Sequence, residues 1–395
     1  MKPLARKLSF GLFLLLIILM TASNHPTIVQ MSKAAGLLIG SILSRYIIMV
    51  YALLFLCCFR LKELFKSKCF ANSIIMLLLV GLYAIMTLAF YSSKEMLGDI
   101  RAIGICVVAV GIGWLLALDY KQYLFLIVAF SLATTFVGLS QVFVNIGGFV
   151  IEDQLLTDNK NSLGVMLATS AFVLWQLYSN SQRGDKFRIL LPVAVVLIVV
   201  IMLTTRVRSA LLVIVIMLFL SLYEHKKQSA FGIYLIATII GVALALVFLP
   251  GIREYIFDSF VQNSEGDITS GRLERNAVGI EFLLDHLFAG TLGTHVSLEQ
   301  IHNYPLNRIC EYGIVFSFPI MLIYFYYIFV DIKQIRRSDT YDNWNIGYYV
   351  LLIPIINSLT EPTFPFGPGT ASVFNFILFG VSLKHTYLTS FQKVQ

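Results

Sequence analysis

Charged residues are scarce in this chain of 395 residues, and their scarcity excludes an ordinary soluble protein. Asp, Glu, Lys and Arg make up 13% of the sequence, whereas a soluble domain carries about 25%. Hydrophobic residues make up 58%. The short alternating strands of a membrane β-barrel are also missing, so long apolar stretches must satisfy their backbone groups as helices.

The cysteines indicate neither a metal site nor a disulfide framework. The chain has five cysteines, and no pair has metal-ligand spacing with nearby histidines or indicates a disulfide framework. The net charge of +7 comes without a basic domain, so we expect no nucleic-acid partner. The sequence predicts neither a metal nor a cofactor, and it contains no internal repeat.

Long apolar blocks are what the sequence does contain, and each is long enough to cross a bilayer core as a helix. The pattern predicts an all-α polytopic transmembrane bundle of about twelve spans. We expect the spans at 8–23, 38–59, 73–91, 102–118, 123–143, 163–179, 189–204, 210–223, 230–249, 310–330, 346–359 and 371–388.

The basic residues predict the orientation of these spans. With both termini in the cytoplasm, the inner segments hold most of the lysines and arginines, as the positive-inside rule requires. The chain then divides into nine spans in 1–249, one long outer loop at 250–308, and three spans with a short cytoplasmic tail in 309–395. We expect the loop to carry the chemistry.

The outer basic residues are mostly arginines, which bind phosphate through a rigid two-pronged guanidinium. Arg206 and Arg208 stand at an outer junction of two spans, where they either bind pyrophosphate or serve as interfacial anchors. Arg272 stands near the start of a helix, where an anion is favoured, whereas Arg275 is interpreted as a surface charge. Arg101 is a further outer arginine.

The loop itself predicts an amphipathic helix on the membrane surface, with Thr269 or Ser270 as its cap and Gly290 and Gly293 at its end. The apolar positions with helical spacing are Leu273, Ala277, Ile280, Leu284, Leu287 and Phe288.

Three further residues could contact a substrate. His302 can accept a proton near neutral pH, although a histidine beside a span is often structural. Asn303 could orient a substrate or the histidine ring. Asn161 stands where the sixth span opens, either as a helix cap or as an amide donor to a sugar or phosphate.

Together these stretches resemble the O-antigen ligase and O-antigen polymerase superfamily of bacterial envelope-glycan enzymes. The resemblance covers roughly 155–320 and depends on the order and placement of its motifs. These are Asn161 with Gly164, Arg208-Ser209-Ala210-Leu211-Leu212, Ser270-Gly271-Arg272, Gly290-Thr291-Leu292-Gly293, and His302-Asn303 followed by Gly313.

The resemblance implies an enzyme of the bacterial inner membrane with its active site facing the periplasm. It implies a donor glycan on undecaprenyl pyrophosphate and, for a ligase, the lipid A core oligosaccharide as acceptor. His302 would be the general base and Arg208 and Arg272 would bind the pyrophosphate, with Arg206 and Arg101 as weaker candidates. The reaction would need no metal and would invert the anomeric centre.

This sequence departs from the family pattern in two places. Val207 stands where a serine usually precedes the turn arginine, and Arg206 is an added charge. The aromatic residue that often follows Ser-Gly-Arg is absent, with Asn276 nearby instead. These departures bear on the fit of the substrate more than on the class of reaction.

Three alternatives remain. A polymerase would join lipid-linked repeat units, but polymerases of this superfamily often have two large outer loops, and here only 250–308 is long. A transporter of lipid-linked glycan fits the number of spans but lacks two related halves. A metal-dependent glycosyltransferase generally needs carboxylates in its first outer loop, and residues 24–33 contain none.

Overall fold

The fold is helical throughout the part of the chain that the computed structural model describes. That part comprises residues 3–34, 68–90, 94–116, 118–146, 153–181, 190–205, 207–224, 271–291, 301–337, 342–367 and 369–392. Within it there are helices and turns and no strand. Four helices are long and apolar enough to cross a membrane, and they cover Leu97–Leu115, Tyr120–Phe143, Asn161–Asn180 and Tyr304–Arg337.

The helices follow the apolar blocks of the sequence. Their bounds are α1 Pro3–Ala22, α2 Pro26–Ala34, α6 Lys68–Phe90, α7 Lys94–Leu115, α8 Tyr120–Ile146, α9 Asp153–Asn180, α10 Leu190–Thr204, α11 Arg208–Glu224, α14 Arg272–His286, α15 Tyr304–Arg337, α16 Ile346–Asn357 and α17 Thr370–Gln392, with a short 3₁₀ helix η3 at Asn343–Asn345. The expected spans at 38–59 and 230–249 lie outside the described residues.

Two helix starts differ from the expectation. The helix α9 begins at Asp153, so Asn161 lies inside it. The alternative in which Asn161 caps this helix is therefore wrong. The helix α15 begins at Tyr304 and continues to Arg337, well beyond the apolar block at 310–330. The start of α15 lies in polar sequence, where Arg308 pairs with Asp99 of α7 and with Glu311.

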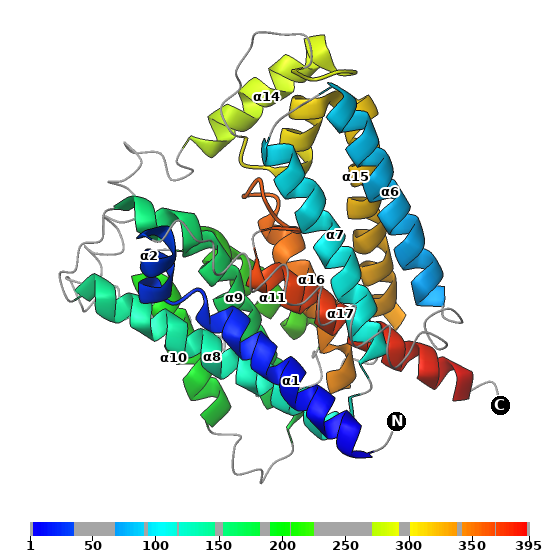
Figure 1. Cartoon of the computed structure of the whole chain (residues 1–395). Coiled ribbons are helices and arrows are strands. Elements are labelled where there is room, and N and C mark those ends of the chain that lie inside the picture. The colour runs from blue at the N-terminus through cyan, green and yellow to red at the C-terminus, as the bar shows by residue number, and fades with distance from the viewer. Residues whose placement is uncertain are drawn as a thin grey trace.

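The helix α17 packs closely on α7 and α16 near the middle of the molecule (Figure 1). Glycines make this approach possible: a Cβ atom at Gly113 of α7 would collide with the backbone of Ile377, and one at Gly380 of α17 with the backbone of Val110. Small residues allow two helix backbones to come together in this way. The buried centre therefore consists of closely packed apolar helices.

Large apolar side chains also cover the outside of the molecule. On α15, Phe318, Phe325 and Phe329 are exposed, and on α8 Leu132 and Phe136 are exposed. An isolated soluble protein rarely exposes so much apolar surface, whereas a hydrocarbon environment would cover it. This pattern agrees with the four membrane-spanning candidates.

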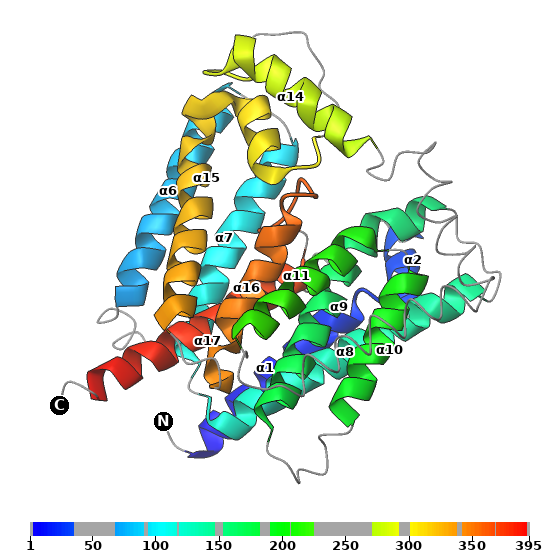
Figure 2. The same cartoon turned by 180° about the vertical axis from the view of Figure 1, so that it is seen from behind.

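The helix α14 lies across the end of the molecule where α15 begins, as the two opposite views in Figures 1 and 2 show. Gly279 is buried on its inner side, next to Ile301 and Cys310. Its predicted apolar face points away from the body: Leu273 is 68% exposed and Leu284 80%. The expected cap at Thr269 or Ser270 is wrong, because the N-cap is Gly271 with φ 73°.

Two glycines fix the junction between α14 and α15. Gly290 has φ 59° and Gly313 has φ 69°, conformations that other residues rarely adopt. Each lies so close to the other segment that a Cβ would collide with backbone atoms. The amide of Ile314 donates to the carbonyl of Leu287 at 2.8 Å, so α15 is kinked where it meets the end of α14.

Candidate functional site

The site begins with a tight turn at 301–304 that presents His302. The Asn303 Oδ1 atom accepts from the Leu306 amide at 3.0 Å and so caps the first turn of α15. The Ile301 amide donates to Asn307 Oδ1 at 3.2 Å. The backbone around His302 is therefore held on both sides, and Asn303 has a structural role in this turn.

A second segment, the loop between α16 and α17, is bonded to this turn. The Tyr304 amide donates to the Ser358 carbonyl at 2.8 Å, and Asn303 Nδ2 donates to the Leu359 carbonyl at 3.4 Å. The rings of Tyr304 and Phe366 pack edge to face, with centroids 5.8 Å apart. These contacts hold the loop, and with it Glu361, against the start of α15.

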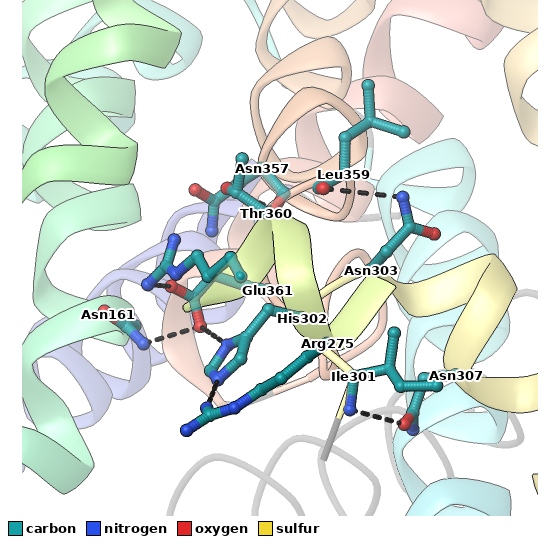
Figure 3. Close-up of polar contacts among 11 residues, drawn as sticks. Asn161, Arg275, Ile301, His302, Asn303, Asn307, Asn357, Leu359, Thr360 and Glu361 are labelled. Carbon is teal, nitrogen blue, oxygen red and sulfur yellow. Dashed lines mark hydrogen bonds and ion pairs between the residues drawn. The ribbon is translucent and has the colours of Figure 1, made fainter. Parts of the chain in front are cut away.

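Glu361 is the centre of the polar cluster, and its side chain is only 3% exposed. Arg272 Nη2 of α14 donates to its Oε1 atom at 2.8 Å, and Asn161 Nδ2 of α9 donates to its Oε2 atom at 2.7 Å. A buried carboxylate needs this charge and these donors to offset its desolvation. Figure 3 shows Glu361 with Asn161 on one side and His302 on the other.

His302 lies between Glu361 and Arg275. Its Nδ1 atom is 3.9 Å from Glu361 Oε2, and its Nε2 atom is 3.3 Å from Arg275 Nη1 (Figure 3). Since a guanidinium can only donate, Nε2 is the acceptor in this contact and Nδ1 carries the proton of the neutral ring. Among the described residues, no hydrogen-bond acceptor is within bonding distance of the buried Nδ1 atom.

The surroundings keep this ring neutral. Burial, followed by the positive charges of Arg272 and Arg275, lowers the pKa of His302 to about 4. A neutral imidazole at physiological pH has a lone pair with which to accept a proton, as a general base must. The same environment makes it a weak base, because the two arginines disfavour the imidazolium.

Arg208 begins α11 and is related to the cluster through α9. A Cβ at Gly164 of α9 would collide with Val207 and would approach the Ala210 Cβ to 2.9 Å, so the start of α11 packs on this part of α9. Asn161, which donates to Glu361, is one helical turn from Gly164. Arg208, half-buried, therefore lies at the same end of the molecule as the cluster.

The other predicted arginines contribute less to this geometry. Arg206 lies outside the described residues. Arg101 is exposed on α7. Its neighbour Asp99 pairs with Arg308.

Two members of the cluster were missed or misinterpreted. The interpretation of Arg275 as a mere surface charge is wrong, because its guanidinium contacts the ring of His302. Glu361 was not singled out, although it is the last carboxylate side chain in the sequence, alone after Asp342. A solitary carboxylate between two apolar blocks, in a chain whose predicted outer loops are rich in arginine, was the signal that could have found it.

A separate ion pair anchors the start of α15. Arg308 is 8% exposed in its side chain and contacts Asp99 of α7 at 2.8 Å and Glu311 at 2.6 Å. Its guanidinium also lies over the ring of Tyr304 at 5.4 Å. Arg308 therefore ties α7 to the first turns of α15, directly behind the turn that carries His302.

Comparison of the chain with models of protein families gives no match, and comparison with curated proteins gives none either. In the described part of the chain, no group of three or more His, Cys, Asp or Glu side chains is placed to hold a metal ion. The fold and the site therefore define a helical protein with membrane-spanning candidates and an arginine-histidine-carboxylate cluster at one end.

Proposed function

We propose that this chain is an O-antigen ligase of the bacterial inner membrane. It would transfer a glycan from undecaprenyl pyrophosphate to a hydroxyl of the lipid A core oligosaccharide. The supporting observation is that Arg272 and His302, both from 250–308, lie beside one buried carboxylate, and that Arg275 contacts the ring of His302. Such a cluster combines charge for a pyrophosphate with a neutral imidazole for proton transfer.

The proposal includes the full topology. About twelve spans would place both termini in the cytoplasm and the His302 end of the bundle in the periplasm. The exposed apolar face of α14 supports this arrangement, because it suits a helix that lies in the outer lipid-headgroup region. The lipid-linked donor would then reach the cluster along the membrane surface.

The chemistry is a direct displacement at the anomeric carbon. His302 Nε2 takes the proton from the acceptor hydroxyl while that oxygen forms a bond to the anomeric carbon. The bond from this carbon to the pyrophosphate oxygen breaks, and the electron pair leaves with the pyrophosphate. Arg208 and Arg272 stabilise the charge on the departing oxygens, and attack from the opposite side inverts the centre.

Arg275 would join the two arginines in binding the pyrophosphate. It follows Arg272 by three positions on α14, so the two side chains project from the same side of the helix. Asn303 would keep the His302 turn in place, and Asn161 would keep Glu361 in place. Arg206 and Arg101 remain weaker candidates for donor binding.

Transfer with purified protein tests this function and its nearest alternative. The protein in nanodiscs is supplied with lipid-linked glycan and EDTA, and with either lipid A core or a second lipid-linked unit as acceptor. Product on lipid A core supports the ligase, and product only on the lipid-linked unit identifies a polymerase. A strict need for Mg²⁺ would instead favour a metal-dependent transferase.

Variants connect the activity to the cluster. His302→Ala should lose about 10²–10⁴-fold in rate, the usual contribution of a general base. Arg208→Ala should also lose activity, whereas Arg337→Ala, an exposed arginine at the far end of α15, should behave as the wild type. Full activity in both His302→Ala and Arg208→Ala would overturn the mechanism.

A further inference from the structure

In the structure, three of the groups proposed to bind or activate the substrate, Arg272, Arg275 and His302, already have partners within the protein. Arg272 is paired with Glu361 at 2.8 Å, and Arg275 donates to His302 Nε2 at 3.3 Å. Nε2 is the only ring nitrogen of the neutral imidazole with an available lone pair, because Nδ1 carries the proton. A base whose lone pair already accepts a bond from Arg275 is not ready to accept the proton of a sugar hydroxyl.

On the opposite side of the ring, within the described residues, the Nδ1–H group lacks a hydrogen-bond acceptor. The proton on Nδ1 points into a buried region where, in the part of the chain that the structure describes, it finds no acceptor. The described carboxylate oxygen on this side is Glu361 Oε2 at 3.9 Å, which is too long for a hydrogen bond. Glu361 is meanwhile engaged by Arg272 and Asn161.

On this basis, and resting on the proposed function, we infer that the pyrophosphate of the donor activates His302 by exchanging these partners. Arg272 breaks its ion pair with Glu361 and Arg275 breaks its hydrogen bond to Nε2, and both guanidinium groups bind the pyrophosphate instead. The free Nε2 atom can then accept the acceptor's proton. Glu361, released from Arg272, shifts to accept a hydrogen bond from Nδ1–H and so stabilises the imidazolium as it forms.

The charges favour this exchange. A pyrophosphate carries more negative charge than one carboxylate and offers several oxygens to two guanidinium groups at once. The Arg272 side chain is 30% exposed, so an anion can reach it from outside, while Glu361 behind it is 3% exposed. The two arginines on α14 would therefore move outward by a side-chain change, without any movement of helices.

The electrostatics of His302 change in the same step. Within the described residues, the charged groups that face the ring are Arg272 and Arg275 from α14 and Glu361 from the loop between α16 and α17. The two arginines hold its pKa low, and an anion that neutralises them removes that effect. His302 thus becomes a stronger base only when a donor is present, which couples donor binding to proton abstraction.

The exchange can be observed without transfer by measuring the titration of His302 with inorganic pyrophosphate as the probe. The chain has six histidines, and a ¹⁵N-histidine spectrum of the protein in nanodiscs can be assigned for this position by comparison with His302→Ala. Pyrophosphate should move the Nε2 resonance in the direction of a lost hydrogen bond. It should also raise the pKa of His302 by at least about one unit, a tenfold change in its protonation equilibrium.

Three variants separate the parts of the proposal. Arg275→Gln should raise the pKa of His302 without pyrophosphate and should respond less when pyrophosphate is added. Glu361→Gln should still show the shift of the Nε2 resonance when pyrophosphate is added. The pKa of His302 should rise less in this variant, since an amide stabilises an imidazolium less than a carboxylate does. Glu361→Asp should restore part of that rise, and Arg337→Ala should match the wild type.

The outcomes distinguish this inference from the proposed function. If wild-type protein transfers glycan but pyrophosphate leaves the titration of His302 unchanged, the exchange is wrong and the ligase proposal stands. A response in Arg275→Gln as large as that of the wild type also overturns the exchange. If no acceptor is glycosylated while pyrophosphate still shifts His302, the exchange holds and the proposed reaction is wrong.

Discussion

Single residues decide the proton chemistry of this site. His302 is neutral because it is buried beside two arginines, and its tautomer follows from the guanidinium of Arg275 at Nε2. Glu361 pairs with Arg272, and its Oε2 atom is 3.9 Å from Nδ1 on the other side of the ring. A histidine, a carboxylate and two arginines therefore act as one electrostatic unit, and a change in any of them alters the others.

The pH dependence of transfer should reveal this coupling. A general base works only when it is unprotonated, so activity falls as the pH drops below its pKa. For kcat/KM, which reports the free enzyme, the acidic limb should lie near pH 4, because the pKa of His302 is lowered to about 4. For kcat, which reports the complex with donor, the limb should lie at higher pH.

The measurement is a pair of pH–rate profiles with the donor varied. Glu361→Gln should narrow the gap between the two limbs, whereas Arg337→Ala should leave the gap unchanged. Identical limbs for kcat and kcat/KM in the wild type would mean that donor binding does not change the basicity of His302.

At the scale of elements, α14 has three distinct sides. Arg272, Arg275 and the buried Gly279 face the body of the protein. Leu284 belongs to the exposed apolar side, and Asp285 is exposed on a third, acidic side. A helix with this pattern can present arginines inward, apolar side chains to lipid and carboxylates to water at the same time.

We therefore expect Leu284 to contact lipid and Asp285 to contact water. In a variant without native cysteines, a spin label at Leu284→Cys should be quenched mainly by oxygen, which partitions into lipid. The matched label at Asp285→Cys should be quenched mainly by a water-soluble nickel chelate. Equal exposure of both labels to the nickel chelate would contradict a membrane contact of α14.

The glycine junction between α14 and α15 should be intolerant of substitution. Gly313→Ala would place a residue with a Cβ at φ 69° and against the backbone of Phe288 and Ala289. We expect it to lower stability by more than about 1 kcal/mol and to reduce transfer, since the junction positions both α14 and the His302 turn.

Thermal unfolding of the purified protein measures this effect. Gly104→Ala on α7 is the matched control, because in the described part of the chain no atom other than its own helix backbone lies within 4 Å of the added Cβ. The control should leave the unfolding temperature nearly unchanged or raise it slightly. A Gly313→Ala protein as stable as the control would show that the junction accommodates a Cβ at this position.

At the scale of the whole molecule, a partly buried ion pair between Arg308 and Asp99 joins distant parts of the chain behind the site. The Arg308 side chain of α15 is 8% exposed and contacts Asp99 of α7 and Glu311, so Arg308→Met removes a buried guanidinium from two partly exposed carboxylates. We expect Arg308→Met to destabilise the protein by about 1–3 kcal/mol, the usual cost of removing one partner of a partly buried charged pair. Thermal unfolding and the yield of folded protein measure the loss.

A double variant checks the cause. Asp99→Asn combined with Arg308→Met removes charge from both partners and should be more stable than Arg308→Met alone. If the double variant is less stable than the wild type by the sum of the losses in Asp99→Asn and Arg308→Met, the two residues do not interact energetically. Arg337→Ala, exposed at the other end of α15, should unfold as the wild type does.

The sequence by itself determined the helical class and the positions of most of the helices, because long apolar blocks satisfy their backbone bonds locally. It also indicated His302 and Arg272, since their residue types already specify proton transfer and anion binding. Only the tertiary structure decided that Glu361 lies between Arg272 and His302 and that Arg275 contacts the ring. These contacts join residues far apart in the chain, and packing of α9, α14, α15 and the loop after α16 determines which of them meet.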